Sequence, residues 1–181
     1  MTDFQNTVAD HADRQAAFIK NVAEQIERAK EDYERRGMVS TSVTPEQLER
    51  KLRRVNSPMI VSQGWSGSAP VGGTIDYSVG ISNPDPVDYS SLFVHLFIGP
   101  ANIAPDVDDA VAAVDERFPR LTNPQFAGLL LKAGSFEQIN FTIPVPGVDK
   151  SNYLGNSFLF QSTWHDPATY LDRSLFVFEV T

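Results

Sequence analysis

The sequence contains no cysteine and has few basic side chains. Without cysteine the chain can form no disulfide bond, no thiolate metal site and no cysteine nucleophile. Its 15 basic side chains stand against 23 acidic ones, which gives a formal net charge of -8 over 181 residues. Because general nucleic-acid binding needs a basic surface that displaces counterions, this balance argues against nucleic acid as the partner.

Long apolar runs and targeting patterns are missing as well. No stretch of about 18 apolar residues occurs, so the sequence predicts no membrane span. Residues 1–5 have neither the basic nor the apolar region of a signal peptide. We therefore expect a cytoplasmic protein or a component of a larger assembly.

Recognisable catalytic motifs are absent. The sequence has no GxSxG, P-loop, GxGxxG or HExxH pattern, and no two of its histidines lie at metal-ligand spacing. We therefore expect no enzyme, no cofactor and no metal. A hydrolase with dispersed carboxylates remains an alternative, and its candidate residues on or near strands are Asp76, Glu137 and Asp172.

The composition changes near residue 57. Residues 1–57 hold ten basic and ten acidic side chains, so the remainder carries the whole charge of -8. Of the 12 prolines only Pro45 precedes residue 58, and of the 12 phenylalanines only Phe4 and Phe18 do. The break predicts a helical N-terminal segment at 1–57 and a β-sandwich domain at 58–181.

The stretch 7–36 predicts a long helix. It lacks proline and glycine and is rich in good helix formers, and Gly37 is a natural stop. Apolar residues spaced by three and four form a stripe on one face, which consists of Ile19, Val22, Ile26, Ala29 and Tyr33. Two interpretations stay open. The stripe packs on the chain's own domain, or it forms a short coiled coil between chains.

A second helix is predicted after Thr44. Thr44, Pro45 and Gln47 form a capping box with proline at the first helical position. A basic run near the end of this helix consists of Arg50, Lys51, Arg53 and Arg54. These charges either complement the helix dipole on a solvated face or dock on an acidic partner, such as the acidic β region.

Residues 58–181 predict about seven strands. The segments 74–81 and 137–143 alternate apolar and polar residues, as strands with one wet face do. The segments 91–98 and 175–178 are apolar on both faces, so we expect them to lie centrally or to be covered by the N-terminal helix. Further strands are predicted at 59–65, 126–131 and 158–164.

Turn signals separate these strands. With this punctuation the pattern predicts an antiparallel immunoglobulin-like β-sandwich of about seven strands, preceded by two helices. One insertion interrupts it, because acidic residues followed by alanine and valine predict a short helix at 105–117 on a long loop.

Three features of the β region carry a family resemblance. The segment 71–83 is a strand that starts in Val-Gly-Gly and ends in Asn83, an apolar strand then ends in Gly99, and the turn at 131–135 leads into 141–146. In this layout residues about 70–180 resemble bacterial immunoglobulin-like modules of the CARDB type. The resemblance implies a spacer or binding platform without catalytic activity. The N-terminal helices and the helical insertion depart from the family's pattern.

The function we expect is that of a non-enzymatic structural or assembly module. Its helices and sandwich loops would contact a protein partner or a second copy, as in a homo-oligomer. The alternative is a carbohydrate- or small-ligand-binding sandwich. Its candidate residues are Trp164, His165 and Asp166, because an exposed tryptophan can stack on a sugar whose hydroxyls bind the other two. These three residues equally suit a simple turn before Pro167.

Overall fold

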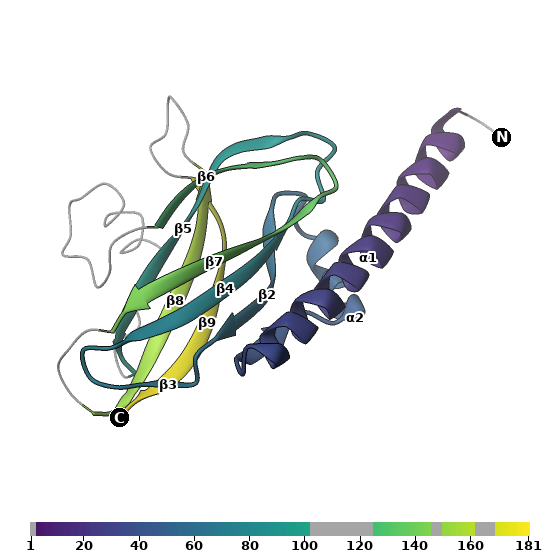
Figure 1. Ribbon diagram of the computed structural model, residues 1–181. Helices are drawn as coiled ribbons and strands as arrows, with labels where there is room; N and C mark the ends of the chain where they lie inside the picture. Colours follow the sequence, from purple (N-terminus) through teal and green to yellow (C-terminus); the bar gives the residue numbers. More distant parts are fainter. Residues whose placement is uncertain (1–2, 102–124, 146–149, 162–168) are drawn as a thin grey trace.

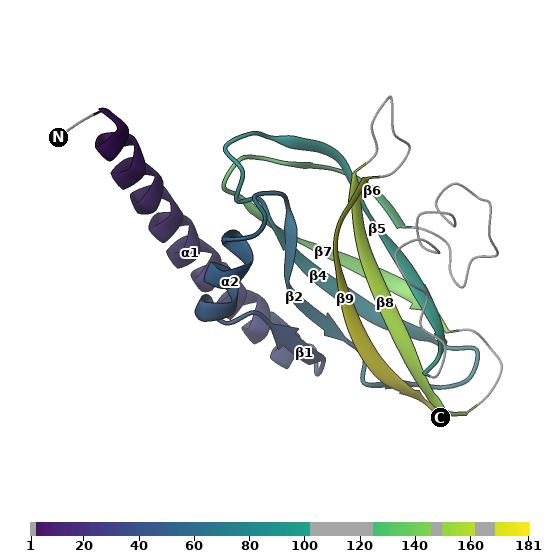
Figure 2. The same cartoon turned by 180° about the vertical axis from the view of Figure 1, so that it is seen from behind.

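The computed structural model describes residues 3–101, 125–145, 150–161 and 169–181. Two β-sheets lie face to face, and both helices lie outside the sandwich against one of the sheets (Figures 1 and 2). This is the immunoglobulin-like β-sandwich with N-terminal helices that the sequence predicts. The helical insertion expected at 105–117 lies outside the described residues.

Both predicted helices are present, but α1 begins at Asp3, four residues before the predicted start at residue 7. Helix α1 spans Asp3–Arg35, and Gly37 follows it with φ 65°, which glycine adopts without steric cost. The amide of Met38 donates to the carbonyl of Tyr33 at 2.9 Å and closes the C-terminal turn. Helix α2 spans Pro45–Leu52, and the predicted capping box is formed by Thr44 and Gln47.

Each sheet is built mainly from neighbouring antiparallel strands. The first has the order β1-β2-β4-β7 and the second the order β3-β9-β8-β5-β6. The first sheet consists of β1 (Val39–Ser42), β2 (Met59–Trp65), β4 (Thr74–Ser82) and β7 (Phe136–Pro144). The second consists of β3 (Ser68–Ala69), β9 (Thr169–Val180), β8 (Asn152–Gln161), β5 (Tyr89–Pro100) and β6 (Gln125–Leu131). Each of the seven predicted strands corresponds to an observed one. The strand predicted at 158–164 is the end of β8, and residues 162–164 lie outside the described residues. The short strands β1 and β3 were not predicted.

The core between the sheets follows the predicted alternation. Four residues of β4 point inward and are fully buried, namely Ile75, Tyr77, Val79 and Ile81. Alternate residues of β5 face them from the other sheet, namely Leu92, Val94, Leu96 and Ile98. Burying each of these side chains stabilises the folded state by about 1.5–3 kcal/mol, so this layer holds the two sheets together.

A parallel seam joins the first sheet to the second at one edge. After β2 the chain changes sheets, and β3 pairs in parallel with the last strand, β9. The amide of Glu179 donates to the carbonyl of Gly67 at 3.0 Å, and that of Thr181 donates to Ala69 at 2.9 Å. Each pair is offset by the same number of residues, so the two segments run side by side in a fixed register.

Side chains continue this register where the backbones of β2 and β9 separate. Gln63 Nε2 donates to the carbonyl of Leu175 at 2.6 Å, and Trp65 Nε1 donates to that of Val177 at 2.9 Å. Both pairs are again 112 residues apart. These donors pair with carbonyls at the edge of β9. Without them this edge would remain open to pairing with another strand.

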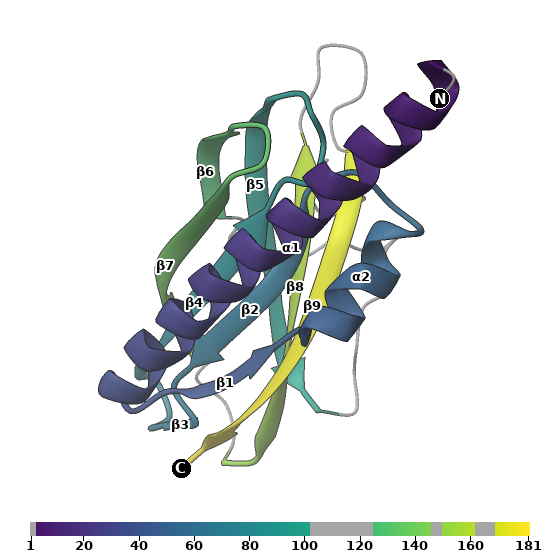
Figure 3. The ribbon, with the colours of Figure 1, turned by 90° about the vertical axis from the view of Figure 1, so that its right-hand side faces the viewer.

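Helix α1 packs across the outer face of the first sheet, where it contacts β1, β2, β4 and β7 (Figure 3). The ring of Tyr33 lies directly over Gly64, since a Cβ atom built there would come within 2.5 Å of the ring. The hydroxyl of Tyr33 is 3.2 Å from Ser62 Oγ. Small side chains on this face therefore let the helix come close.

Of the two alternatives for the apolar strands at 91–98 and 175–178, the central position is confirmed, because β5 lies between β8 and β6 and β9 lies between β3 and β8. Covering by the N-terminal helix is wrong. Both segments belong to the second sheet, and the helices lie on the first. Outward residues of β5 are buried all the same, and rings pair there, as Phe93 does with Phe160 at 5.5 Å. On β9 the outward side chains of Leu175 and Val177 are 49% and 51% exposed.

Replacing Gly64 tests the close approach of α1. Gly64→Ala places a methyl group against the ring of Tyr33, and we expect the free energy of unfolding to fall by about 1–3 kcal/mol. Urea denaturation measures it. In a Tyr33→Ala background the same glycine substitution should cost much less, and an equal cost in both backgrounds would contradict the packing described.

Replacing Gln63 tests the seam. Gln63→Met keeps the volume but leaves the carbonyl of Leu175 and the hydroxyl of Tyr77 without the partner that Gln63 supplies, so we expect a loss of about 3 kcal/mol. Thr41→Val removes only the 3.3 Å bond from Gln63 Nε2 and serves as control, with an expected loss below about 1 kcal/mol. Equal losses would show that the seam does not depend on the bonds from Gln63 to Leu175 and Tyr77.

Candidate functional site

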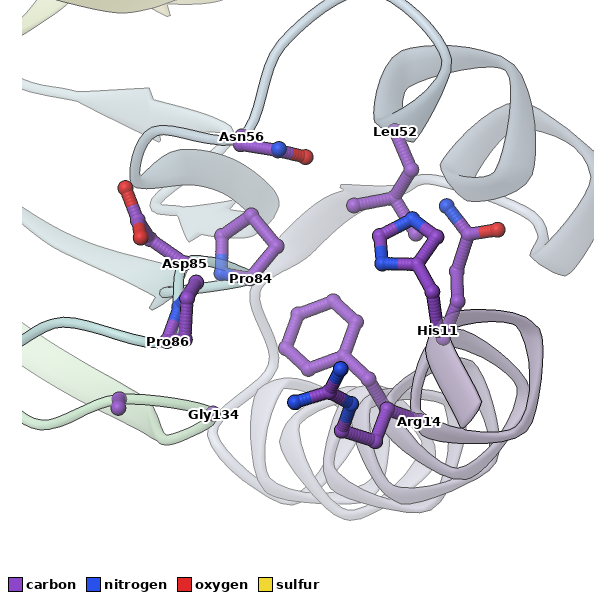
Figure 4. Close-up of a pocket in the computed structure, with 11 residues that line it drawn as sticks. His11, Arg14, Leu52, Asn56, Pro84, Asp85, Pro86 and Gly134 are labelled. Atoms are coloured by element: carbon purple, nitrogen blue, oxygen red, sulfur yellow. The ribbon is translucent and has the colours of Figure 1, made fainter. Parts of the chain in front are cut away.

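A cleft of about 420 Å³ opens where the N-terminal half of α1 leaves the sandwich (Figure 4). Helix α1 forms one wall, the end of α2 and the following residues form another, and two loops of the sandwich form the third. Its lining residues are His11, Arg14, Gln15, Phe18, Leu52, Asn56, Pro84, Asp85, Pro86, Ala133 and Gly134.

The wall from α1 follows helical geometry. His11, Arg14, Gln15 and Phe18 are spaced by three, one and three residues, which places them on one side of a helix. His11 and Arg14 are exposed, and the ring of His11 points toward Leu52 of α2 (Figure 4). Phe18 is half-buried and packs against the apolar cluster under the helices. This wall therefore joins an apolar base to a cationic rim.

The loop wall is braced by the buried side chain of Asn83. Its Nδ2 donates to the carbonyls of Val87 at 2.9 Å and Leu131 at 3.2 Å, and its Oδ1 accepts from the amide of Asp85 at 3.0 Å. The amide of Gly134 also donates to the carbonyl of Asn83 at 2.9 Å. One buried residue thus ties together the two loops that line the cleft, so this wall is preformed.

The carboxylate of Asp85 is engaged by its own loop. Oδ2 accepts from the hydroxyl of Tyr89 at 2.8 Å and Oδ1 accepts from the amide of Val87 at 3.3 Å. Burial, together with the hydrogen bond to Asp85 and its negative charge, raises the pKa of Tyr89 to about 12. The phenol therefore stays protonated and keeps donating to Asp85 at neutral pH.

The α1 stripe lies on the chain's own sandwich, the first of the two arrangements considered. Val22, Ile26, Ala29 and Tyr33 are 0–5% exposed, and Ile19 is half-buried beside them. In this conformation Val22 and Ile26 pack with residues of α2 and β2, and the ring of Tyr33 lies over Gly64.

The four residues of the basic run at the end of α2 lie in different environments. Lys51 Nζ donates to Asp172 Oδ2 of β9 at 2.9 Å, and the amide of Ile60 donates to the same oxygen at 2.8 Å. Arg53 pairs with Glu49 of its own helix at 2.9 Å. Only Lys51 of the run therefore forms a salt bridge to an acidic group of the sandwich among the described residues. Arg50, Arg53 and Arg54 are exposed.

The candidate ligand residues Trp164, His165 and Asp166 lie outside the described residues. The candidate carboxylates are described and lie apart. Asp76 lies on the first sheet and accepts from Thr142 Oγ1. Asp172 lies on the second sheet and pairs with Lys51 of α2. Glu137 is opposite Ile81, five residues along β4 from Asp76.

Two kinds of site were also sought across the part of the chain that the structure describes. No group of three or more histidine, aspartate or glutamate side chains there could hold a metal ion. None of the helices in the same residues combines the length and the apolar character needed to cross a membrane.

The sequence did not predict the cleft. Nothing in the sequence brings residues 83–86 next to residues 11–18 or 133–134. The sequence carries one signal of the wall from α1. His11, Gln15 and Phe18 recur along the helix with spacings of four and three, so they share one face of it.

Comparison with protein-family models and with curated protein sequences finds no match. Solved structures show similarity at low identity. The C-terminal domain of wzt is 11% identical, with 80% of this chain and 78% of that chain covered and a TM-score of 0.49. A CARDB domain from Pyrococcus furiosus is 12% identical, with 69% and 84% covered and a TM-score of 0.39.

A Paenibacillus cycloisomaltooligosaccharide glucanotransferase is also similar in structure. It is 16% identical over 64% of this chain, with a TM-score of 0.40. The match spans 13% of that chain.

The raised pKa of Tyr89 makes the stability of the loop wall depend on pH. Because the folded pKa is about 12 and the ordinary value is about 10, the hydrogen bond contributes fully below pH 10. Its contribution is lost as pH rises from about 10 to about 12. We expect the free energy of unfolding, measured in urea across this window, to fall more steeply for the natural chain than for Tyr89→Phe. Parallel curves would contradict the assignment.

Proposed function

We propose that this chain is a non-enzymatic protein-interaction module. The sandwich at 58–181 is the scaffold, and the segment 1–57 supplies the main contacts to a partner protein or a second copy. The observation that carries the proposal is the projecting part of α1. Residues Thr7–Arg14 are all exposed and extend past the sandwich, whereas the stripe downstream is buried (Figures 1 and 3).

The length of α1 exceeds what its packing on the sandwich requires. Its 33 residues span about 50 Å, and the fully buried stripe begins only at Val22. Isolated helical stretches are marginal in water because most helix stability in proteins comes from packing. Val8 is 52% exposed on this projecting part. A helix end of this kind gains stability when a partner covers it, which supports a role in assembly.

The end of α2 supplies charge near the same end of the molecule. Arg50, Arg53 and Arg54 are exposed, and the Arg53–Glu49 pair is exposed on both sides. Exposed pairs of this kind contribute only about 0–1 kcal/mol, so these arginines remain available to an acidic partner. Such charges raise the rate of association more than the affinity, and the effect weakens with salt.

The candidate carboxylates also support a role without catalysis. Asp172, on the second sheet, accepts from Lys51 and from the amide of Ile60. Asp76, on the first sheet, accepts from Thr142 of the neighbouring strand. A hydrolase that works with a pair of carboxylates needs both of them to flank one scissile bond. Their separation favours a binding module over the hydrolase.

Two matched substitutions test the projecting helix. Val8 and Val71 are both exposed valines, at 52% and 40%, on different parts of the molecule. Val8→Glu places a charge on the projecting helix, whereas Val71→Glu places the same charge in the turn before β4. We expect the natural chain to self-associate in light scattering or to retain a defined partner in affinity capture. Val8→Glu should weaken that association by about tenfold, and Val71→Glu should leave it unchanged.

A natural chain that is strictly monomeric and retains no partner would overturn the proposal. If both variants associate as strongly as the natural chain, the projecting helix does not contribute to the proposed contacts. Circular dichroism of Val8→Glu provides the control for folding, since glutamate is a better helix former than valine.

A further inference from the structure

The cleft beside α1 has the build of a binding site. Its volume of about 420 Å³ lies within the roughly 300–1,000 Å³ of ligand pockets. Phe18 and Leu52 form an apolar base, and Pro84 and Pro86 line the opposite side. The brace from Asn83 holds this side in place before anything binds, which lowers the entropic cost of association.

The charge that faces the cleft is positive. The guanidinium group of Arg14 points across the cleft toward the loop, and its Nε donates to the carbonyl of Asp10 at 3.3 Å. No salt bridge engages Arg14 among the residues that the structure describes. The carboxylate of Asp85 is turned toward its own loop, where Tyr89 and Val87 occupy it (Figure 4).

The shape of the cleft suits a chain segment better than a compact molecule. The lining residues of α1 run from His11 to Phe18, which is about 10 Å along the helix axis. Beyond His11 the exposed surface of the helix continues to Thr7. On the other side the cleft reaches Asn56, three residues after the exposed Arg53. A bound segment would therefore meet the positive charge of Arg14 beside an apolar base.

We propose that this cleft binds a segment of a partner protein that presents an apolar side chain next to acidic ones. The apolar side chain lies against Phe18 and Leu52, and a carboxylate pairs with Arg14. The inference rests on the proposed function and names the chemistry of the partner.

Peptide selection on the natural full-length chain tests it. The probe is a phage-displayed library of random peptides, followed by the labelled form of the most enriched peptide in fluorescence anisotropy. We expect enriched peptides to carry a large apolar residue with aspartate or glutamate within a few positions. Replacing those acids by their amides should weaken binding by about tenfold, and added salt should weaken it further.

Two pairs of variants locate the bound peptide. Arg14→Glu reverses the charge in the cleft, and Arg28→Glu does so at an exposed site on the same helix outside it. Ala133→Trp fills the cleft from an exposed position, and Lys132→Trp adds the same side chain next to it. We expect the first member of each pair to weaken peptide binding by about tenfold and the second to leave it unchanged.

Four outcomes overturn the inference. They are the absence of any enriched peptide, the enrichment of basic peptides, binding that Ala133→Trp leaves intact, and self-association that the cleft variants abolish without any peptide binding. The last would identify a second copy as the occupant. Partner association that is sensitive to Val8→Glu but unaffected in Arg14→Glu and Ala133→Trp would leave the proposed function standing and remove the cleft from it.

Discussion

The parallel seam between β2–β3 and β9 is the constraint on which the other contacts depend. Backbone pairs at Gly67 and Ala69 and side-chain pairs from Gln63 and Trp65 all share one register with β9. The seam fixes one sheet against the other at the edge where the chain changes sheets. It also positions α2, since Asp172 of β9 accepts from both Ile60 and Lys51. Buried partners of this kind are costly to leave unpaired, so the register has little freedom to slip.

The outer face of the first sheet then decides where α1 lies. Glycine and serine on this face leave room for the helix, and the ring of Tyr33 fills the space above Gly64. Asp32 adds polar contacts at the end of the helix, where its Oδ2 accepts from Gln138 Nε2 at 3.1 Å. With its C-terminal half fixed, the straight helix carries its N-terminal half past the sheet. The cleft is a consequence of that geometry, because the projecting half faces the loops at the same end.

Most elements could be predicted because their signals are local. The capping box at Thr44, the stop at Gly37 and the alternation in β4 each depend on neighbours within a few residues. The strands β1 and β3 escaped prediction because both are too short to show a period. The site escaped for another reason. Its walls come from α1, from the end of α2 and from two loops. The packing of α1 on the first sheet, the seam and the braced loops together bring these segments to one place.

The sequence by itself determined which residues share a face. Val22, Ile26 and Ala29 must lie on one side of any helix that this stretch forms, since the period of 3.6 residues places them there. It did not determine what that side would cover, because the free energy of burial depends on apolar area and is indifferent to whose surface covers it. Tertiary structure decided that point. The small residues at Gly64 and Ser62 fit the stripe closely, so the helix packs on its own sheet and leaves its first turns beyond the sandwich.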